Sequence, residues 1–307
     1  MLRRRAPRKQ GSRDVGSASV GDEAAQWSRR FASAPVDAMQ FYEDVFVPGL
    51  FIPWANVLLD EVGVAPGDIV LDVACGPGTV SRLAAVRAGQ GGRVVGADIS
   101  TAMLAIASRK PANAGAIIEY VESPAAPLRV DDARFDVVVC QQGLQFFPDR
   151  PAALAEMRRA LRPGGRLGIA VWGPIDELPP FAGLARAVRD VMGDEAADRY
   201  EGGPWGFSSV DDLRSVIEEA GFVGVEVEAR SLDVHFVGGP ARFAQTLAAS
   251  AVATDVASLT ASSRARLAEA VERHLSPLHV DGALRAPTVS NIAVAHRDPR
   301  ESATMAR

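Results

Sequence analysis

The sequence predicts a doubly wound α/β fold with a mostly parallel seven-stranded sheet and a helical cap. Short β-branched runs alternate with helical stretches from about residue 69 onward, and a glycine turn follows the first of these runs. Two further helical stretches are inserted after later runs. Parallel strands need a helix to return the chain between them, so this alternation indicates a parallel sheet.

The composition is that of a globular chain. Its 307 residues are 48% hydrophobic and 23% charged, which is enough to bury a full-sized core. A net charge of -5 gives no general attraction to nucleic acid, so we expect none as a partner. Cys75 and Cys140 have neither metal-ligand spacing nor disulfide density, which predicts no metal site and a cytoplasmic location. No apolar run reaches the length of about 18 residues that a membrane span needs.

The N-terminal part divides into a tail and a helical segment. Residues 1–30 are basic and then rich in glycine and serine, which predicts a disordered tail rather than a transit peptide. A single domain is expected over 31–307. Residues 31–60 have a helical pattern rich in aromatic side chains, and we expect two short helices interrupted by Pro48 and Pro53.

The rest of the chain follows the alternating order. Strands are predicted at 69–74, 93–98, 116–121, 135–140, 166–172, 224–238 and 286–297, and helices near 79–88, 101–109, 150–161 and 209–220. The insertions 174–207 and 239–285 are predicted to be helical. Both leave from the carboxyl ends of strands, where open parallel sheets bind ligands. We therefore expect 31–60, 174–207 and 239–285 to form a cap that buries a substrate and excludes water.

The turn after the first strand, in "VLDVACGPGTV" (70–80), indicates a nucleoside ligand. Gly76 and Gly78 allow a ligand to approach the backbone at the start of a helix, and Asp98 closes the second strand where a carboxylate can accept both ribose hydroxyls. A dinucleotide site has a third glycine, but Ser81 stands at that position. Asp72 suits a cationic amino acid tail better than a pyrophosphate. S-adenosylmethionine has such a tail.

These motifs resemble those of the class I S-adenosylmethionine-dependent methyltransferases, in particular the small-molecule branch with the ubiquinone and menaquinone biosynthesis C-methyltransferases. The stretches that carry the resemblance lie within about 40–172 and are "VLDVACGPGTVSRLAA", "VVGADISTAMLAIA" and "RFDVVVCQQGLQFFPDRPAALAEMRRALRPGGRLGIAVW". The resemblance implies a Rossmann-like methyltransferase fold, S-adenosyl-L-methionine as cofactor, and methyl transfer.

The resemblance also implies site residues. The expected cofactor contacts are Asp72, Ala74, Gly76, Gly78, Asp98, Ile99, Met103, Ser123, Ala125 and Gln141. Ala74 stands where the family often has glycine. Pro124 stands where the family often has an acidic residue that binds the adenine amino group, and Glu122, Ser123 or the backbone at Ala125 are the candidates to replace it.

The expected reaction is an in-line displacement that transfers a methyl group to a small, largely apolar metabolite. Such a reaction needs alignment more than a nucleophile. Gln141 is a candidate to orient the acceptor and His235 a candidate general base. The alternative is a non-catalytic or non-methylating S-adenosylmethionine-binding relative of the same fold. The sequence leaves a homodimer open.

Overall fold

The computed structural model describes residues 43, 44, 46–110 and 115–303. In this part of the chain an eight-stranded sheet has the order β3-β2-β1-β4-β5-β8-β6, with β7 paired to β8. Strands β1 to β5 are parallel, and β8 is antiparallel to both β5 and β6. The bounds are β1 Ile69–Val73, β2 Arg93–Asp98, β3 Ile117–Glu122, β4 Phe135–Gln141, β5 Leu161–Trp172, β6 Val223–Val237, β7 His279–Val280 and β8 Ala283–His296. The predicted α/β fold is confirmed.

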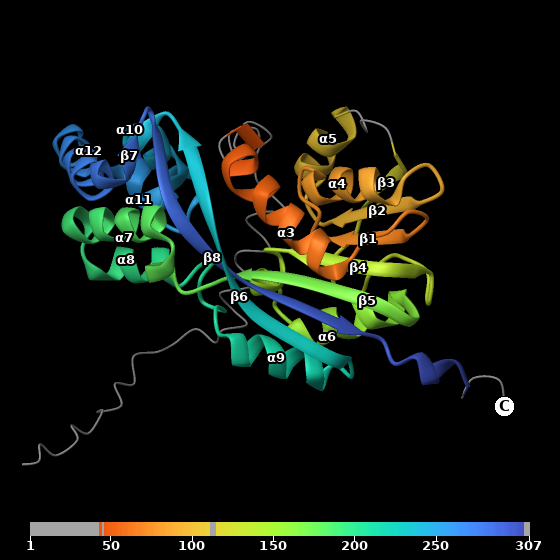
Figure 1. Cartoon of the computed structure of the whole chain (residues 1–307). Coiled ribbons are helices and arrows are strands. Elements are labelled where there is room, and N and C mark those ends of the chain that lie inside the picture. Colours follow the sequence, from red (N-terminus) through yellow and green to blue (C-terminus); the bar gives the residue numbers. More distant parts are fainter. Residues whose placement is uncertain (1–42, 45, 111–114, 304–307) are drawn as a thin grey trace, which may run out of the picture.

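Helices cover both faces of the sheet. On one face lie α3 (Ile52–Val62), α4 (Thr79–Ala88) and α5 (Thr101–Arg109), and on the other lie α6 (Arg150–Ala160) and α9 (Val210–Glu219) (Figure 1). Side chains at the N-caps explain where three of these helices begin. Ser100, Asp149 and Ser209 each accept a hydrogen bond from a backbone N–H in the first turn of α5, α6 and α9. The four helices predicted after the first strand are confirmed to within one residue at each end.

The two insertions form a helical cluster at one end of the sheet. The first contains α7 (Pro179–Met192) and α8 (Asp194–Glu201), and the second contains α10 (Gly239–Ala244), α11 (Ala253–Ser258) and α12 (Ala261–Leu275). Figure 1 shows these helices together beside the far ends of β6 and β8. Gly183 on α7 lets α12 approach closely, since a Cβ at this position would lie 2.4 Å from Leu275 Cδ2.

One expectation about the second insertion is wrong. Residues 279–285 are not helical, because β7 and the start of β8 form a hairpin there, which adds an eighth strand. Asp281 and Gly282 form its turn with φ of 51° and 76°. An Asp-Gly pair is a strong signal for such a tight turn, since both central residues need positive φ.

The described part of segment 31–60 also differs from expectation. A π-helix over Val47–Phe51 runs directly into α3, and Pro48 and Pro53 lie at the starts of these two helices instead of interrupting them. Proline is well suited to the first turn because its missing N–H has no intrahelical partner there. Residues 52–60 belong to α3, whose Leu58 packs against the sheet near Gly168 of β5. The predicted tail, 1–30, lies outside the described residues.

In the described ranges, no helix has the length and apolar character needed to cross a membrane.

Candidate active site

The turn between β1 and α4 holds its backbone in a rare conformation. Ala74, Gly76 and Gly78 have φ of 57°, 53° and 76°, all in the left-handed region. Glycine adopts this region without cost, whereas a residue with a Cβ is destabilised by about 1–2 kcal/mol. The space that a Cβ at Gly76 would enter is open, with nothing within 4 Å. A ligand can therefore reach the backbone at Gly76.

Asp98, at the end of β2, organises this turn. Its Oδ2 accepts a hydrogen bond of 2.7 Å from the Gly76 N–H, and its Oδ1 accepts one of 2.8 Å from the Ser100 N–H. The side chain is only 8% exposed. Burial raises the pKa of Asp98, and the bonds from the Ser100 and Gly76 N–H groups oppose this shift. A carboxylate offers about four lone-pair sites, so acceptor capacity remains for a ligand hydroxyl.

Asp72 lies behind the turn instead of in front of it. The side chain is 1% exposed, and its Oδ2 accepts a 2.6 Å hydrogen bond from the Ser81 hydroxyl of α4. Burial raises the pKa of Asp72 to about 7; the hydrogen bond from Ser81 opposes this shift, and the nearby charge of Asp98 adds to it. Ser81 stands at the position where a dinucleotide site would have glycine, and its hydrogen bond connects α4 to β1.

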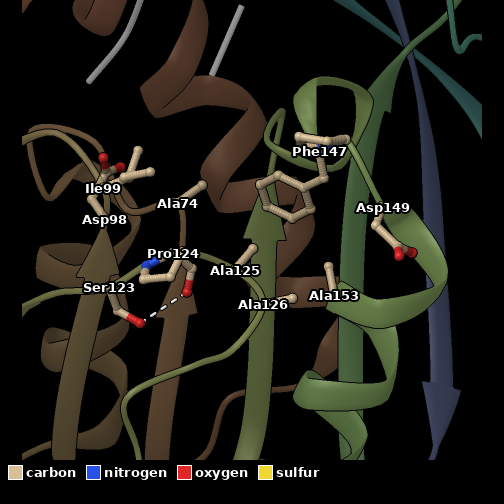
Figure 2. A pocket seen from close by; sticks show the side chains of 11 residues that line it. Ala74, Asp98, Ile99, Ser123, Pro124, Ala125, Ala126, Phe147, Asp149 and Ala153 are labelled. Atoms are coloured by element: carbon tan, nitrogen blue, oxygen red, sulfur yellow. Dashed lines mark hydrogen bonds between the residues drawn. The ribbon is translucent and has the colours of Figure 1, made fainter. Parts of the chain in front are cut away.

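Two neighbouring cavities open in front of these residues. One has a volume of about 210 Å³ and the other about 120 Å³, and both are lined by Ala74, Asp98, Ile99 and Phe147. The larger lies between the loop 123–126 after β3 and the loop 147–149 before α6, as Figure 2 shows. The smaller extends along Gly76, Met103 and the segment 141–143 at the end of β4. The cavities therefore follow the carboxyl ends of β1, β2, β3 and β4.

An unpartnered hydroxyl at the start of α4 also suits a polar ligand. The Thr79 hydroxyl, at the first residue of this helix, is buried and has no hydrogen-bond partner among the described residues. A Cβ at Gly78 would lie 2.3 Å from the Tyr120 hydroxyl, so Tyr120 packs directly against the turn. Hydroxyl and N–H groups at a helix N-terminus favour a carboxylate. The donor set fits a ligand with a nucleoside at Asp98 and an amino acid group at the turn.

Comparison with known proteins agrees with this geometry. A methyltransferase domain model matches residues 70–165. The chain is 34% identical over 193 residues to a ubiquinone/menaquinone biosynthesis C-methyltransferase of Haemophilus ducreyi, which covers 59% of this chain and 74% of that protein. It is 38% identical over 120 residues to the chloroplastic 2-phytyl-1,4-beta-naphthoquinone methyltransferase of Arabidopsis thaliana, which covers 38% of this chain and 46% of that protein. The chain thus spans about half the length of this second relative.

The chain belongs to the class I S-adenosylmethionine-dependent methyltransferases. Its cofactor is S-adenosylmethionine. The fold agrees with a solved structure of phosphoethanolamine N-methyltransferase 2 of Haemonchus contortus, which contains S-adenosylhomocysteine. The two structures have a TM-score of 0.54 and 20% sequence identity. The match covers 92% of this chain and 61% of the Haemonchus contortus chain.

The methyltransferase brings most of the expected cofactor contacts together. The residues that line one or both cavities are Ala74, Gly76, Asp98, Ile99, Met103, Ser123, Ala125 and Gln141. Asp72 and Gly78 line neither cavity: Asp72 lies behind the turn, and Gly78 packs against Tyr120. Gln141 Nε2 donates a 3.1 Å hydrogen bond to the Phe51 carbonyl, which connects the cavity wall to the π-helix.

The wall around Pro124 has a different chemistry from the one the family often has. The Ser123 hydroxyl donates to the Pro124 carbonyl and accepts from the Arg129 N–H, at 2.8 and 2.9 Å. Asp149, from the opposite wall of the larger cavity, was missed in the sequence. Its Oδ1 accepts a 2.8 Å hydrogen bond from the Ala152 N–H as the cap of α6. The only signal in the sequence was the helix-start pattern of "PDRP".

The structure does not place His235 at the site. Its side chain is exposed near the end of β6, and it lines neither of the two cavities. Its backbone carbonyl faces Gly49, where a Cβ would lie 2.3 Å from the oxygen. Near His235 the strand therefore serves as a surface against which the π-helix packs.

Proposed function

We propose that this methyltransferase transfers a methyl group to a small, largely apolar metabolite by in-line displacement. The observation that supports this acceptor class is a group of packed aromatic rings that a hydrogen bond from Gln141 joins to the wall of the smaller cavity. Phe51, whose carbonyl is bound by Gln141, has its ring 6.0 Å from that of Trp172 and 6.3 Å from that of Phe46. Phe46 in turn lies 6.0 Å from Phe181 of α7. Aromatic surfaces of this kind suit a flat, apolar acceptor.

The names of two relatives support the same class. The protein of Arabidopsis thaliana is named for a naphthoquinone and that of Haemophilus ducreyi for ubiquinone and menaquinone. We carry over from them only the chemical character of a small molecule with an apolar ring. A cap formed by the two insertions and residues 46–51 would cover such a molecule and exclude water.

The residues of the chain would mainly bind and align the reactants. S-adenosylmethionine, when bound, supplies a methyl group on a sulfonium that is already a good leaving group. Asp98 would hold the ribose, Ile99 and Met103 would flank the adenine, and the backbone at Gly76 would contact the amino acid end. Gln141 would orient the acceptor from the end of β4. Alignment of this kind can supply several kcal/mol without a covalent intermediate. We assign His235 no part in this chemistry, because its side chain is exposed away from the cavities.

Asp149 is our candidate for the contact that Pro124 does not provide. It lines the cavity opposite Pro124, and Ala152 engages its Oδ1, which leaves Oδ2 for the adenine amino group. Asp149→Ser keeps a capping hydroxyl for α6 but removes the carboxylate. We expect it to weaken S-adenosylhomocysteine binding about tenfold, as measured by calorimetry, with little change in melting temperature. An unchanged affinity would rule this contact out.

The function is tested by turnover. The protein is incubated with S-adenosylmethionine carrying a deuterated methyl group and with an extract of small molecules. We expect S-adenosylhomocysteine to form only when the extract is present, and mass spectrometry should find the label in an apolar product. Binding of S-adenosylhomocysteine without any extract-dependent turnover would favour the alternative, a non-catalytic or non-methylating relative. A homodimer and a cytoplasmic location stay predictions from the sequence.

A further inference from the structure

A chain of buried side-chain hydrogen bonds runs beneath the end of β4. Gln145 Nε2 donates to Gln142 Oε1 at 3.3 Å, Gln142 Nε2 donates to the Ser290 hydroxyl at 3.0 Å, and Ser290 donates to the Val171 carbonyl at 2.8 Å. These three polar residues are 4%, 6% and 0% exposed. Buried polar groups of this kind are normally all paired, because an unpaired one is costly.

The direction of this chain is fixed at its far end. The Val171 carbonyl can only accept, so the single hydroxyl proton of Ser290 must point to it. Ser290 can then only accept from Gln142, which must present its NH₂ group. The Gln142 carbonyl therefore faces Gln145, which must present its own NH₂ group in turn. Gln145 Oε1 is left as an acceptor, and it has no hydrogen-bond partner among the described residues.

Backbone strain supports a functional reason for the arrangement. Gln142 has φ of 56°, a left-handed conformation that costs a residue with a side chain about 1–2 kcal/mol. Strained residues of this kind are concentrated at functional sites. Gln142 lines the smaller cofactor cavity, and its amide carbonyl accepts the hydrogen bond from Gln145.

Gln145 lies between the cofactor cavity and the chain that returns from the cap. Its neighbours Gly143 and Phe146 line the smaller cavity, whereas Gln145 itself does not. Arg150 binds the Gln145 backbone carbonyl at 3.0 Å and lies 4.3 Å over the ring of Phe207, in the segment that follows α8. Gln145 is thus held where the first insertion rejoins the sheet.

We infer that Gln145 Oε1 accepts a hydrogen bond from the methyl acceptor, which must carry a hydroxyl or N–H group on its apolar frame. Gln142 and Ser290 are positioning residues that fix which atom of Gln145 is free. An ether or a ketone in place of the donor would leave this buried carbonyl unpaired. The inference rests on the proposed function, because it places the acceptor beside the cofactor.

The test uses protein saturated with S-adenosylhomocysteine and two probes, 1-naphthol and 1-methoxynaphthalene, which differ in one hydrogen-bond donor. We expect the natural chain to bind 1-naphthol about tenfold more tightly than the ether, as measured by calorimetry. Gln145→Met keeps the length of the side chain and should abolish this preference by weakening 1-naphthol alone. The matched control is Gln245→Met, an exposed glutamine of the second insertion, which should keep the preference.

A second variant tests the direction of the chain independently. Ser290→Ala removes the group that fixes the Gln142 amide, so the two amides can reverse and the preference should fall without loss of S-adenosylhomocysteine binding. Equal binding of the two probes by the natural chain, or no binding of either, would overturn the inference. An unchanged preference in Gln145→Met would also overturn it, because Oε1 would then hold only an internal water. Failure of the natural chain to bind S-adenosylhomocysteine would instead refute the proposed function.

Discussion

Two glycines in the turn after β1 are required for different physical reasons. Both have positive φ, but the space beside them differs. A Cβ at Gly76 would enter open space in front of the turn, whereas a Cβ at Gly78 would meet the Tyr120 hydroxyl behind it. We therefore expect Gly76 to serve ligand binding and Gly78 to serve the packing of the turn.

Alanine substitutions separate these two reasons. Gly76→Ala is expected to weaken S-adenosylhomocysteine binding at least tenfold, with only the loss of about 1–2 kcal/mol in stability that a left-handed residue implies. Gly78→Ala should lower the melting temperature further, because its methyl group displaces Tyr120. Calorimetry and thermal unfolding measure the two effects. Gly63→Ala is the control, since Gly63 has φ of 68° at the end of α3 and would meet only the end of the flexible Arg166 side chain. Equal ligand affinity in Gly76→Ala and Gly63→Ala would contradict this assignment.

Asp72 gives the stability a defined dependence on pH. Its pKa is about 7 in the folded protein, against an ordinary value of 3.8. The folded state then binds more protons than the unfolded state between these values, so the free energy of unfolding decreases as the pH rises through this window. Stability from this group is fully present below pH 4 and is lost as the pH passes 7.

Asp72→Asn removes this dependence and keeps an oxygen for Ser81. We expect the free energy of unfolding of the natural chain to fall by a few kcal/mol relative to the variant between pH 4 and pH 8. Denaturant titrations at several pH values give the difference, from which the similar contribution of Asp98 cancels. If the free energy of unfolding of the two proteins has the same pH dependence over the whole range, the pKa of Asp72 is not raised by folding.

At the scale of elements, the cap is held together by the contact between α7 and α12. Gly183→Val introduces a side chain against Leu275, and overpacking of this kind costs about 1–3 kcal/mol. We expect faster hydrogen exchange in α7 and α12, unchanged exchange in β1 and α4, and an unchanged affinity for S-adenosylhomocysteine. Arg186→Val, on an exposed position of the same helix, is the matched control. Loss of cofactor binding in Gly183→Val alone would show that the cap and the cofactor site are not separable.

The elements that sequence predicted well are those with local signals. Caps at Ser100 and Asp149 and alternating β-branched runs define α5, α6 and the central strands. The Asp281–Gly282 hairpin was missed because the helical pattern of the preceding residues was extended through it. The link from Gln142 to Ser290 joins residues 148 positions apart, and it depends on the pairing of β8 with β5, which no local pattern reveals.

At the scale of the whole molecule, cofactor binding should stabilise the fold. S-adenosylhomocysteine at 100 times its dissociation constant contributes about 2.7 kcal/mol, because it binds only the native state. For a chain of this size the melting temperature should rise by about 4 °C. NAD, measured in parallel by scanning fluorimetry, should leave it unchanged, since Ser81 stands where a dinucleotide site has its third glycine. A shift with NAD and none with S-adenosylhomocysteine would refute the cofactor assignment.

The strands β6 and β8 extend from the sheet into the cap. They remain paired from Val223 with His296 to Val237 with Ala283, beyond the point where β5 ends at Trp172 beside Ser290 (Figure 1). A ladder of backbone hydrogen bonds resists bending far more than a loop does, so the α7–α12 cluster has little freedom to swing as a lid. Exchange of reactants should then depend on residues 46–51, which pack against β6 at Gly49 and which Gln141 binds through the Phe51 carbonyl. The rate of product release would accordingly respond to substitutions in this segment before α3 more than to substitutions where the cap joins the sheet.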